Sequence, residues 1–132
     1  MLYVLPETTG DIIVLQASEI LTEQDYLEVL LPLYQQVAES QEGVRIALYL
    51  DPGFQGIDAT SSWEPQAFAT AHSTSLHYLA ISGAEQWKGL TQNYATTMSQ
   101  TNVSHFGALQ FLQALHWINE DGEAGELYPF GG

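Results

Sequence analysis

The sequence predicts one α/β domain with a mostly parallel sheet of about four or five strands, an antiparallel edge strand and about four packed helices. Two apolar runs near the start of the chain are separated by turn residues, which is typical of a hairpin. The segments Val44–Leu50 and Leu76–Ile81 are almost wholly apolar, as expected for parallel strands covered on both faces. Helical spacing between these segments indicates crossover connections.

The first part of the chain predicts a hairpin followed by a helix. Leu2–Leu5 and Asp11–Ala17 form the expected hairpin. Thr22 opens a helix with a capping box in which Asp replaces the usual Glu. Pro32 lies inside this helix and should kink it, because proline lacks a backbone donor. The apolar positions at helical spacing are Leu27, Leu30, Tyr34 and Val37.

The second part of the chain alternates helices and strands. We expect helices over residues 63–73 and 84–97, with strands over 76–81 and 102–106 between and after them. The last helix is expected over residues 108–118. Its apolar face would carry Leu109, Leu112, Leu115 and Ile118. The domain is expected to span residues 1–119. Residues 120–132 form an acidic, Gly-rich tail whose apolar end, Leu127–Phe130, could dock on a surface.

Charge is the most unusual feature of the composition. The chain has 16 acidic residues and 2 basic residues, which gives a net charge of −14. Such a charge repels phosphate backbones and anionic lipid surfaces, so nucleic acid and membranes are poor partners. A basic protein or bound cations fit better, although an acidic surface can also serve solubility alone. The sequence contains no cysteine and no signal-peptide or membrane-span pattern, so we expect a cytoplasmic protein.

Several segments, in their order and spacing, resemble the SpoIIAA-like family, a branch of the STAS-type α/β folds. The segments are Gly10–Val14, Leu21–Pro32, Phe54–Asp58 with Trp63, Leu79–Gly83 with Trp87, and Ala114–Ile118. The resemblance implies a sheet with packed helices and no assigned enzymatic activity. It also implies a regulatory role through partner binding, in some relatives controlled by phosphorylation. The resemblance extends to the Sec14-type relatives of this fold, which bind lipids.

The loop after Val44–Leu50 is the first candidate site, because ligands of parallel sheets bind beyond the carboxyl ends of the strands. In regulatory STAS domains a phosphorylated serine lies in this region, so the resemblance makes Ser61 and Ser62 possible phospho-acceptors. The usual Asp-Ser-Ser-Gly type of motif is absent here. The alternative is that these serines cap the following helix.

Aromatic residues of the middle third form the second candidate site. Phe54, Trp63, Phe68, Tyr78, Trp87 and Tyr94 could line an apolar pocket between the helices and the sheet. The alternative is that these rings are ordinary core residues, because aromatic side chains dominate protein cores.

Catalysis is not expected from this sequence. It lacks a Gly-x-Ser-x-Gly elbow and a phosphate-binding Gly-rich motif, and His72, His77, His105 and His116 have no zinc-type spacing. His72 is expected on an exposed helix face. Asp51, Asp58 and Glu64 could supply oxygen ligands for a cation, but their spacing matches no EF-hand loop, so we predict no metal and no cofactor. Two functions remain: a non-enzymatic module that binds a protein partner, or a carrier of an apolar, lipid-like molecule. Pairing of sheet edges in a homodimer is also open.

Overall fold

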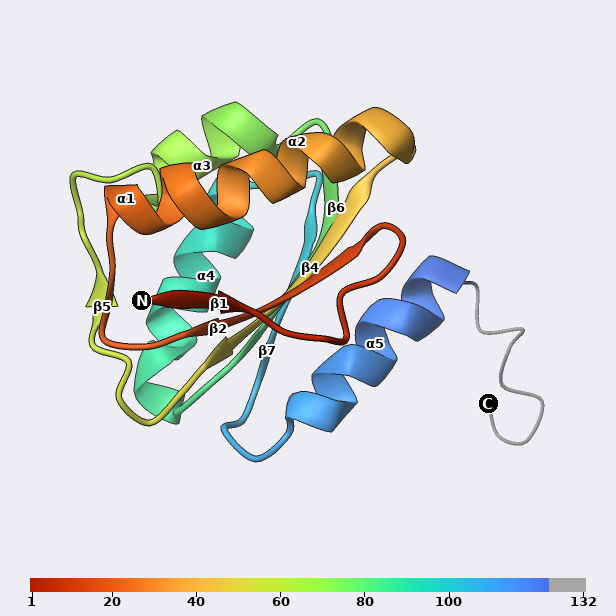
Figure 1. Cartoon of the computed structure of the whole chain (residues 1–132). Coiled ribbons are helices and arrows are strands. Elements are labelled where there is room, and N and C mark those ends of the chain that lie inside the picture. Colours follow the sequence, from red (N-terminus) through yellow and green to blue (C-terminus); the bar gives the residue numbers. More distant parts are fainter. Residues whose placement is uncertain (124–132) are drawn as a thin grey trace.

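A five-stranded sheet runs through the middle of the protein in the order β1-β2-β4-β6-β7 (Figure 1). The computed structural model describes the backbone of residues 1–123 and the side chains of residues 1–119. Strands β2, β4, β6 and β7 are parallel, and β1 is antiparallel to β2, which confirms the predicted fold class. The strands are Leu2–Val4 (β1), Ile12–Ala17 (β2), Val44–Leu50 (β4), Leu76–Ser82 (β6) and Asn102–Phe106 (β7).

The two apolar runs singled out in the sequence are neighbouring parallel strands, as predicted. Ile46 of β4 pairs with Leu79 of β6, and both side chains point into the larger core. Alternate residues of the same strands, Ala47 and Ala80, face the opposite side of the sheet. Burial on both faces explains why these two strands are almost wholly apolar.

Of the helices that the structure describes, most pack on one face of the sheet, and α5 covers the other (Figure 1). The first face carries a continuous helical segment made of α1, the π-helical turn η1 and α2, together with α3 and α4. A 3₁₀ turn, η2, precedes α4. The elements are Glu23–Asp25 (α1), Tyr26–Leu30 (η1), Leu31–Ser40 (α2), Pro65–His72 (α3), Glu85–Trp87 (η2), Lys88–Thr97 (α4) and Phe111–Glu123 (α5). Two short strands, Ile20–Leu21 (β3) and Gly56–Ile57 (β5), pair beside the main sheet.

The predicted capping box at Thr22 is confirmed, but the helix that follows is wound differently from the expectation. The Leu31 N–H donates to the Tyr26 carbonyl across a π turn, directly before Pro32. A π turn has more residues per turn than an α turn. Tyr26, four positions before Leu30, therefore lies on the same helix face as Leu30, and Leu27 does not. Tyr26 is therefore buried, and Leu27, predicted to be buried, is 49% exposed.

The last helix begins later and ends later than predicted. It runs from Phe111 to Glu123, four residues into the predicted tail. Within residues 111–119 of this helix, Ala114 and Ile118 are buried, whereas Leu109 and Leu112 are exposed, contrary to the expected apolar face. Leu109 precedes the helix, so it cannot follow the helical spacing. Residues 124–132, with the apolar segment Leu127–Phe130, lie outside the described residues.

Candidate functional site

A cavity of about 290 Å³ lies at the carboxyl ends of the central strands, where parallel sheets commonly bind ligands. We call it the strand-end pocket. It lies among three loops, which follow β4, β6 and β7. Its lining residues are Tyr49, Leu50, Asp51, Pro52, Phe54, Ala84, Gln86, Trp87 and Ala108. This loop region, Phe54 and Trp87 were predicted from the sequence as parts of candidate sites, whereas Tyr49 and Gln86 were not.

Aromatic rings and one carboxylate define the chemistry of the strand-end pocket. The rings of Phe54 and Trp87 meet edge to face, with centroids 4.8 Å apart. The Asp51 carboxylate accepts hydrogen bonds from the Gln16 side chain at 3.1 Å and from the Gly53 N–H at 2.9 Å. These two donors hold the carboxylate in place, and Asp51 is the one carboxylate among the described residues that line the pocket.

A second hollow of about 410 Å³ adjoins the strand-end pocket and shares Ala84 and Ala108 with it. Lys88 and His105 are among its lining residues. The Lys88 ammonium lies 3.5 Å from the Glu85 carboxylate. Nδ1 of His105 lies 2.9 Å from the Thr91 hydroxyl, and burial is the main cause that lowers the pKa of His105.

The six predicted aromatic residues do not line one common cavity. Trp63, Phe68 and Tyr94 are buried in contact with one another, with centroid distances of 6.0 Å for Trp63–Phe68 and 5.5 Å for Phe68–Tyr94. The cavity beside them has a volume of about 10 Å³, room for one water molecule. Tyr78 lies on the opposite face of the sheet, where its ring packs against Trp117 at 5.6 Å.

Hydrogen bonds fix the interlocked rings in place. The Trp63 indole N–H donates to the Thr22 carbonyl at 2.9 Å, and the Tyr94 hydroxyl donates to the Trp63 carbonyl. Burial, with a smaller contribution from the charge of Glu64, raises the pKa of Tyr94. The hydroxyl therefore remains a hydrogen-bond donor across the physiological range, and these three rings act as core residues.

Neither Ser61 nor Ser62 caps the third helix, contrary to the alternative considered from the sequence. Glu64 is the N-cap of α3, and its carboxylate accepts from the Ala67 N–H at 3.0 Å. Ser61 is buried and donates to the Asp58 carbonyl at 2.6 Å. The Ser62 hydroxyl donates to the Glu23 carboxylate at 3.0 Å. A phosphate on Ser62 would face this carboxylate, which is an unfavourable arrangement.

His72 is buried, and the prediction that it lies on an exposed helix face is wrong. Its Nε2 lies 2.7 Å from the Tyr26 hydroxyl, and its ring packs against Tyr34 at 4.2 Å. Burial lowers the pKa of His72 to about 4, so the ring is neutral at pH 7. His72 lies four residues after Phe68, so both side chains share the buried face of α3, and this spacing could have placed His72 from the sequence.

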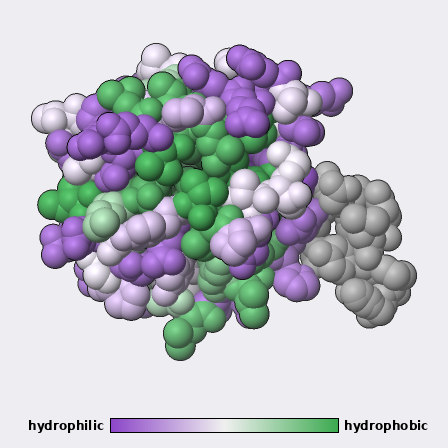
Figure 2. All heavy atoms as spheres, in the orientation of Figure 1, coloured by the Kyte–Doolittle hydropathy of each residue, from purple (hydrophilic) through white to green (hydrophobic). Residues whose placement is uncertain are grey.

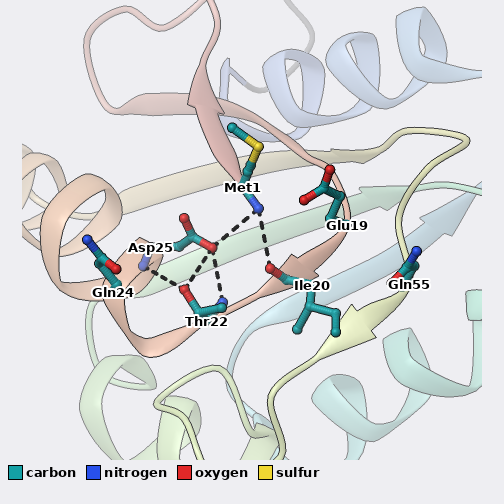
Figure 3. Close-up of a pocket in the computed structure, with 7 residues that line it drawn as sticks. All are labelled: Met1, Glu19, Ile20, Thr22, Gln24, Asp25 and Gln55. Carbon is teal, nitrogen blue, oxygen red and sulfur yellow. Dashed lines mark hydrogen bonds and ion pairs between the residues drawn. The ribbon is translucent and has the colours of Figure 1, made fainter.

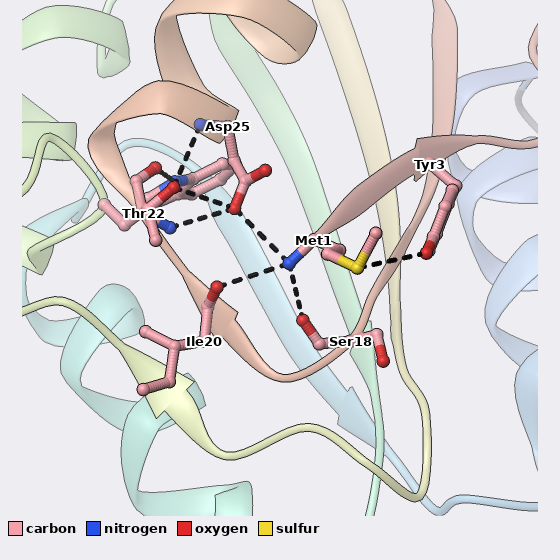
Figure 4. Close-up of polar contacts among 7 residues, drawn as sticks. Met1, Tyr3, Ser18, Ile20, Thr22 and Asp25 are labelled. Atoms are coloured by element: carbon pink, nitrogen blue, oxygen red, sulfur yellow. Dashed lines mark hydrogen bonds and ion pairs between the residues drawn. The ribbon is translucent and has the colours of Figure 1, made fainter.

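A third hollow, of about 530 Å³, lies where the start of β1 meets the turn between β3 and α1 (Figure 3). The Met1 nitrogen donates to the Ser18 carbonyl at 2.7 Å and lies 3.4 Å from the Asp25 carboxylate (Figure 4). Asp25 also accepts from the Thr22 N–H at 3.0 Å. These contacts fasten the beginning of β1 to the N-terminus of the helical segment.

Exposed apolar side chains gather around β1, which is an edge strand of the sheet. Figure 2 shows a band of apolar atoms crossing this face of the molecule in the region of β1. We call this region the edge surface. Each of its members is between 44% and 50% exposed: Met1, Tyr3, Val4, Ile20 and Leu27.

The backbone of β1 also faces outward at alternate residues. The Leu5 N–H donates to the Val14 carbonyl, and the Ser18 N–H donates to the Met1 carbonyl. In an antiparallel pair the residues between such bonds direct their N–H and C=O groups to the other side. The main-chain groups of Leu2 and Val4 therefore point away from β2, as another strand would require.

Two further properties of the described residues bear on function. None of their helices is both long enough and apolar enough to cross a membrane. Within this same part of the chain, no three His, Asp or Glu side chains are grouped as metal binding would require.

Mostly parallel strands, an antiparallel edge strand and helices on both faces define an α/β domain of the STAS type. The family model described as SpoIIAA-like matches residues 12–119 of the chain, and the chain belongs to this family. Domains of this kind are generally non-enzymatic regulatory modules. None of the curated proteins compared with the chain matches it.

Proposed function

We propose that this chain is a non-enzymatic regulatory module that binds a basic protein partner through the edge surface. The observation that carries this proposal is the position of its exposed apolar side chains. Of the seven large apolar side chains that are exposed among the described residues, five lie in the edge surface. Large exposed apolar patches on proteins commonly mark interaction sites.

The charges around the edge surface favour a basic partner. Glu19 lines the same hollow as Met1 and Ile20, and Glu28 directly follows Leu27 in the chain. Neither of the two basic side chains of the protein, Arg45 and Lys88, belongs to the edge surface. Arg45 is buried against Asp11, and Lys88 lies beside Glu85. An apolar centre with an acidic rim is complementary to an apolar segment flanked by Lys or Arg.

The alternative function, a carrier of an apolar molecule, is less well supported. A carrier needs a ligand-sized apolar cavity, typically about 300 Å³ or more. The space among Trp63, Phe68 and Tyr94 is about 10 Å³. The strand-end pocket is larger, but Asp51 makes it unsuitable for a lipid tail. A carboxylate without a counter-charge loses hydration free energy when an apolar ligand covers it.

The test is affinity capture of partners from the cells that make the protein, at low and at high salt. A partner held by charge should be lost as salt rises, because screening weakens exposed ion pairs. The variants Val4→Glu and Leu27→Glu should also lose it. Asn102→Glu is the matched control, because Asn102 is an exposed residue of the opposite edge strand.

Native mass spectrometry of the purified protein separates the two functions. A partner-binding module is expected at the bare mass of the chain, 14.6 kDa, or a multiple of it. An apolar molecule that copurifies in a one-to-one ratio would instead support the carrier and contradict the proposed function.

A further inference from the structure

We propose that the strand-end pocket binds an organic cation, an alkylammonium or guanidinium group. Such a group could belong to a small amine or to a Lys or Arg side chain of another protein. The pocket is separate from the edge surface, so this inference does not depend on the proposed function. It rests on charge, on aromatic lining and on size.

Charge is the first argument. The lining of the strand-end pocket contains the Asp51 carboxylate and no basic side chain. The carboxylate is already oriented by Gln16 and Gly53, so little ordering is needed when a ligand binds. The nearest candidate cation of the protein, Lys88, lines the adjoining hollow and lies 3.5 Å from Glu85. An anion would meet a carboxylate in this pocket with no compensating positive charge.

The aromatic lining is the second argument. Tyr49, Phe54 and Trp87 all border the cavity. Aromatic faces attract cations, and Trp attracts them most strongly, which is why quaternary ammonium groups bind in aromatic cages. Each ring is held by a neighbour: Phe54 and Trp87 pack on each other at 4.8 Å, and Tyr49 packs on Phe111 at 5.3 Å. The three rings that border the pocket are therefore held in place before a ligand arrives.

The same lining makes a metal ion an unsuitable ligand. Ca²⁺ and Mg²⁺ prefer six or more oxygen ligands, counting water. The side chains that line the pocket include one carboxylate, Asp51, and one amide, Gln86, which are too few oxygen ligands for these ions. A volume of about 290 Å³ is at the lower end for small-molecule sites, which suits a small amine or the end of one long side chain.

The experiment is a titration of the whole chain, followed by the indole N–H signals of its three Trp residues in nuclear magnetic resonance spectra. The probe is tetramethylammonium chloride at constant ionic strength. We expect saturable, one-to-one shifts of the Trp87 signal. The Trp63 indole is bonded inside the core to Thr22, so its signal serves as an internal reference that should not move.

Three further probes test the chemistry and the source of the cation. Tert-butanol has nearly the shape of tetramethylammonium but no charge, and it should bind at least about tenfold more weakly. Nα-acetyl-lysine amide and Nα-acetyl-arginine amide, which keep their side-chain charges, represent the Lys and Arg side chains of a partner. Tighter binding of these amides than of tetramethylammonium would assign the pocket to a protein ligand, and the reverse would assign it to a small amine.

Substitutions test the two recognition elements separately. Asp51→Asn and Trp87→Leu should each weaken tetramethylammonium binding by roughly tenfold. Glu42→Gln removes the same charge from an exposed position and should leave binding unchanged. Three results would overturn the proposal: no shift of the Trp87 signal in the unmodified chain, equally strong binding of tert-butanol, or equal weakening by Glu42→Gln.

Discussion

At the scale of single residues, burial decides what several polar side chains of this protein do. His72 and Tyr94 both have hydroxyl or carbonyl partners inside the helical layer. Their pKa values move in the directions that favour the neutral form, since burial disfavours charge. Sequence reasoning recognised Tyr94 as a core candidate but placed His72 on the surface. Polarity alone does not reveal which His has a buried partner 46 positions away.

The pKa of His72 leads to a prediction about acid stability. The pKa is about 4 in the folded protein and near 6.5 when the chain is unfolded, so the unfolded state binds more protons between these values. The contribution of neutral His72 to the free energy of unfolding is therefore fully present above pH 6.5. It is lost progressively as the pH falls to 4. The loss should be on the order of 3 kcal/mol in the free energy of unfolding.

Denaturant unfolding of the wild type and His72→Gln between pH 7 and pH 4 measures this effect. Gln can still bond the Tyr26 hydroxyl, and it does not titrate. We expect the difference in free energy between the two proteins to shrink as the pH falls. His116→Gln, at an exposed helix position, is the control. A constant difference across this pH range would show that His72 is not buried in the neutral form.

At the scale of secondary-structure elements, the strands follow the sequence pattern closely and the helices do so less well. The apolar runs of β4 and β6 were predicted correctly as strands. Both faces of these strands are covered, so nearly every position is apolar. The helical spacing around Pro32 was misleading because a π turn rotates the face and exposes Leu27. At Leu109 the chain is still in the turn after β7, where helical spacing has no meaning.

The strand-end pocket was only partly predictable for the same kind of reason. Asp51 and Phe54 follow a recognisable parallel strand, so their general place at its carboxyl end could be foreseen. Trp87 comes from the 3₁₀ turn η2, more than 30 residues further along the chain, and Tyr49 points to the other face of the sheet. Their meeting depends on strand order and register, which a single sequence does not specify.

The ion pair between Asp11 and Arg45 links three elements. The Arg45 guanidinium donates to both carboxylate oxygens of Asp11, at 2.6 and 2.8 Å, and to the Ile118 carbonyl of α5 at 2.8 Å. We expect Asp11→Asn to lower the free energy of unfolding by about 2–3 kcal/mol, because a buried guanidinium would lose its counter-charge. This value is below that of fully buried pairs, since the Asp11 side chain is 29% exposed.

Chemical denaturation checks this prediction, with Glu7→Gln as the control. Glu7 is an exposed acid in the turn that precedes Asp11, so its removal changes the net charge equally. The control should be neutral or slightly stabilising, because it relieves repulsion among acids. If both variants lose the same stability, the ion pair between Asp11 and Arg45 does not stabilise the fold.

At the scale of the whole molecule, a net charge of −14 should oppose folding at low salt. Raising NaCl from about 10 to 150 mM shortens the screening length from about 30 to 8 Å. We expect the thermal midpoint to rise by roughly 3–6 °C if screening contributes about 1 kcal/mol. Differential scanning calorimetry measures the shift, and a midpoint that falls with NaCl would mean that attractive ion pairs outweigh the repulsion.

The same charge affects association. Two copies of this chain repel each other, so pairing of two β1 edges is disfavoured relative to pairing with a basic segment. The edge surface is nevertheless suited to strand addition, because Leu2 and Val4 present backbone groups outward and apolar side chains flank them. The partner is therefore expected to contribute an extended, apolar segment with Lys or Arg at its ends.

Site-specific photo-crosslinking inside cells tests this account most directly. Benzoylphenylalanine would replace either Tyr3 in the edge surface or Asn102 on the opposite edge strand. The account predicts that a basic protein is joined to the chain from position 3, and that position 102 does not give this product. The same product from both positions, or only chain-to-chain products from position 3, would contradict it.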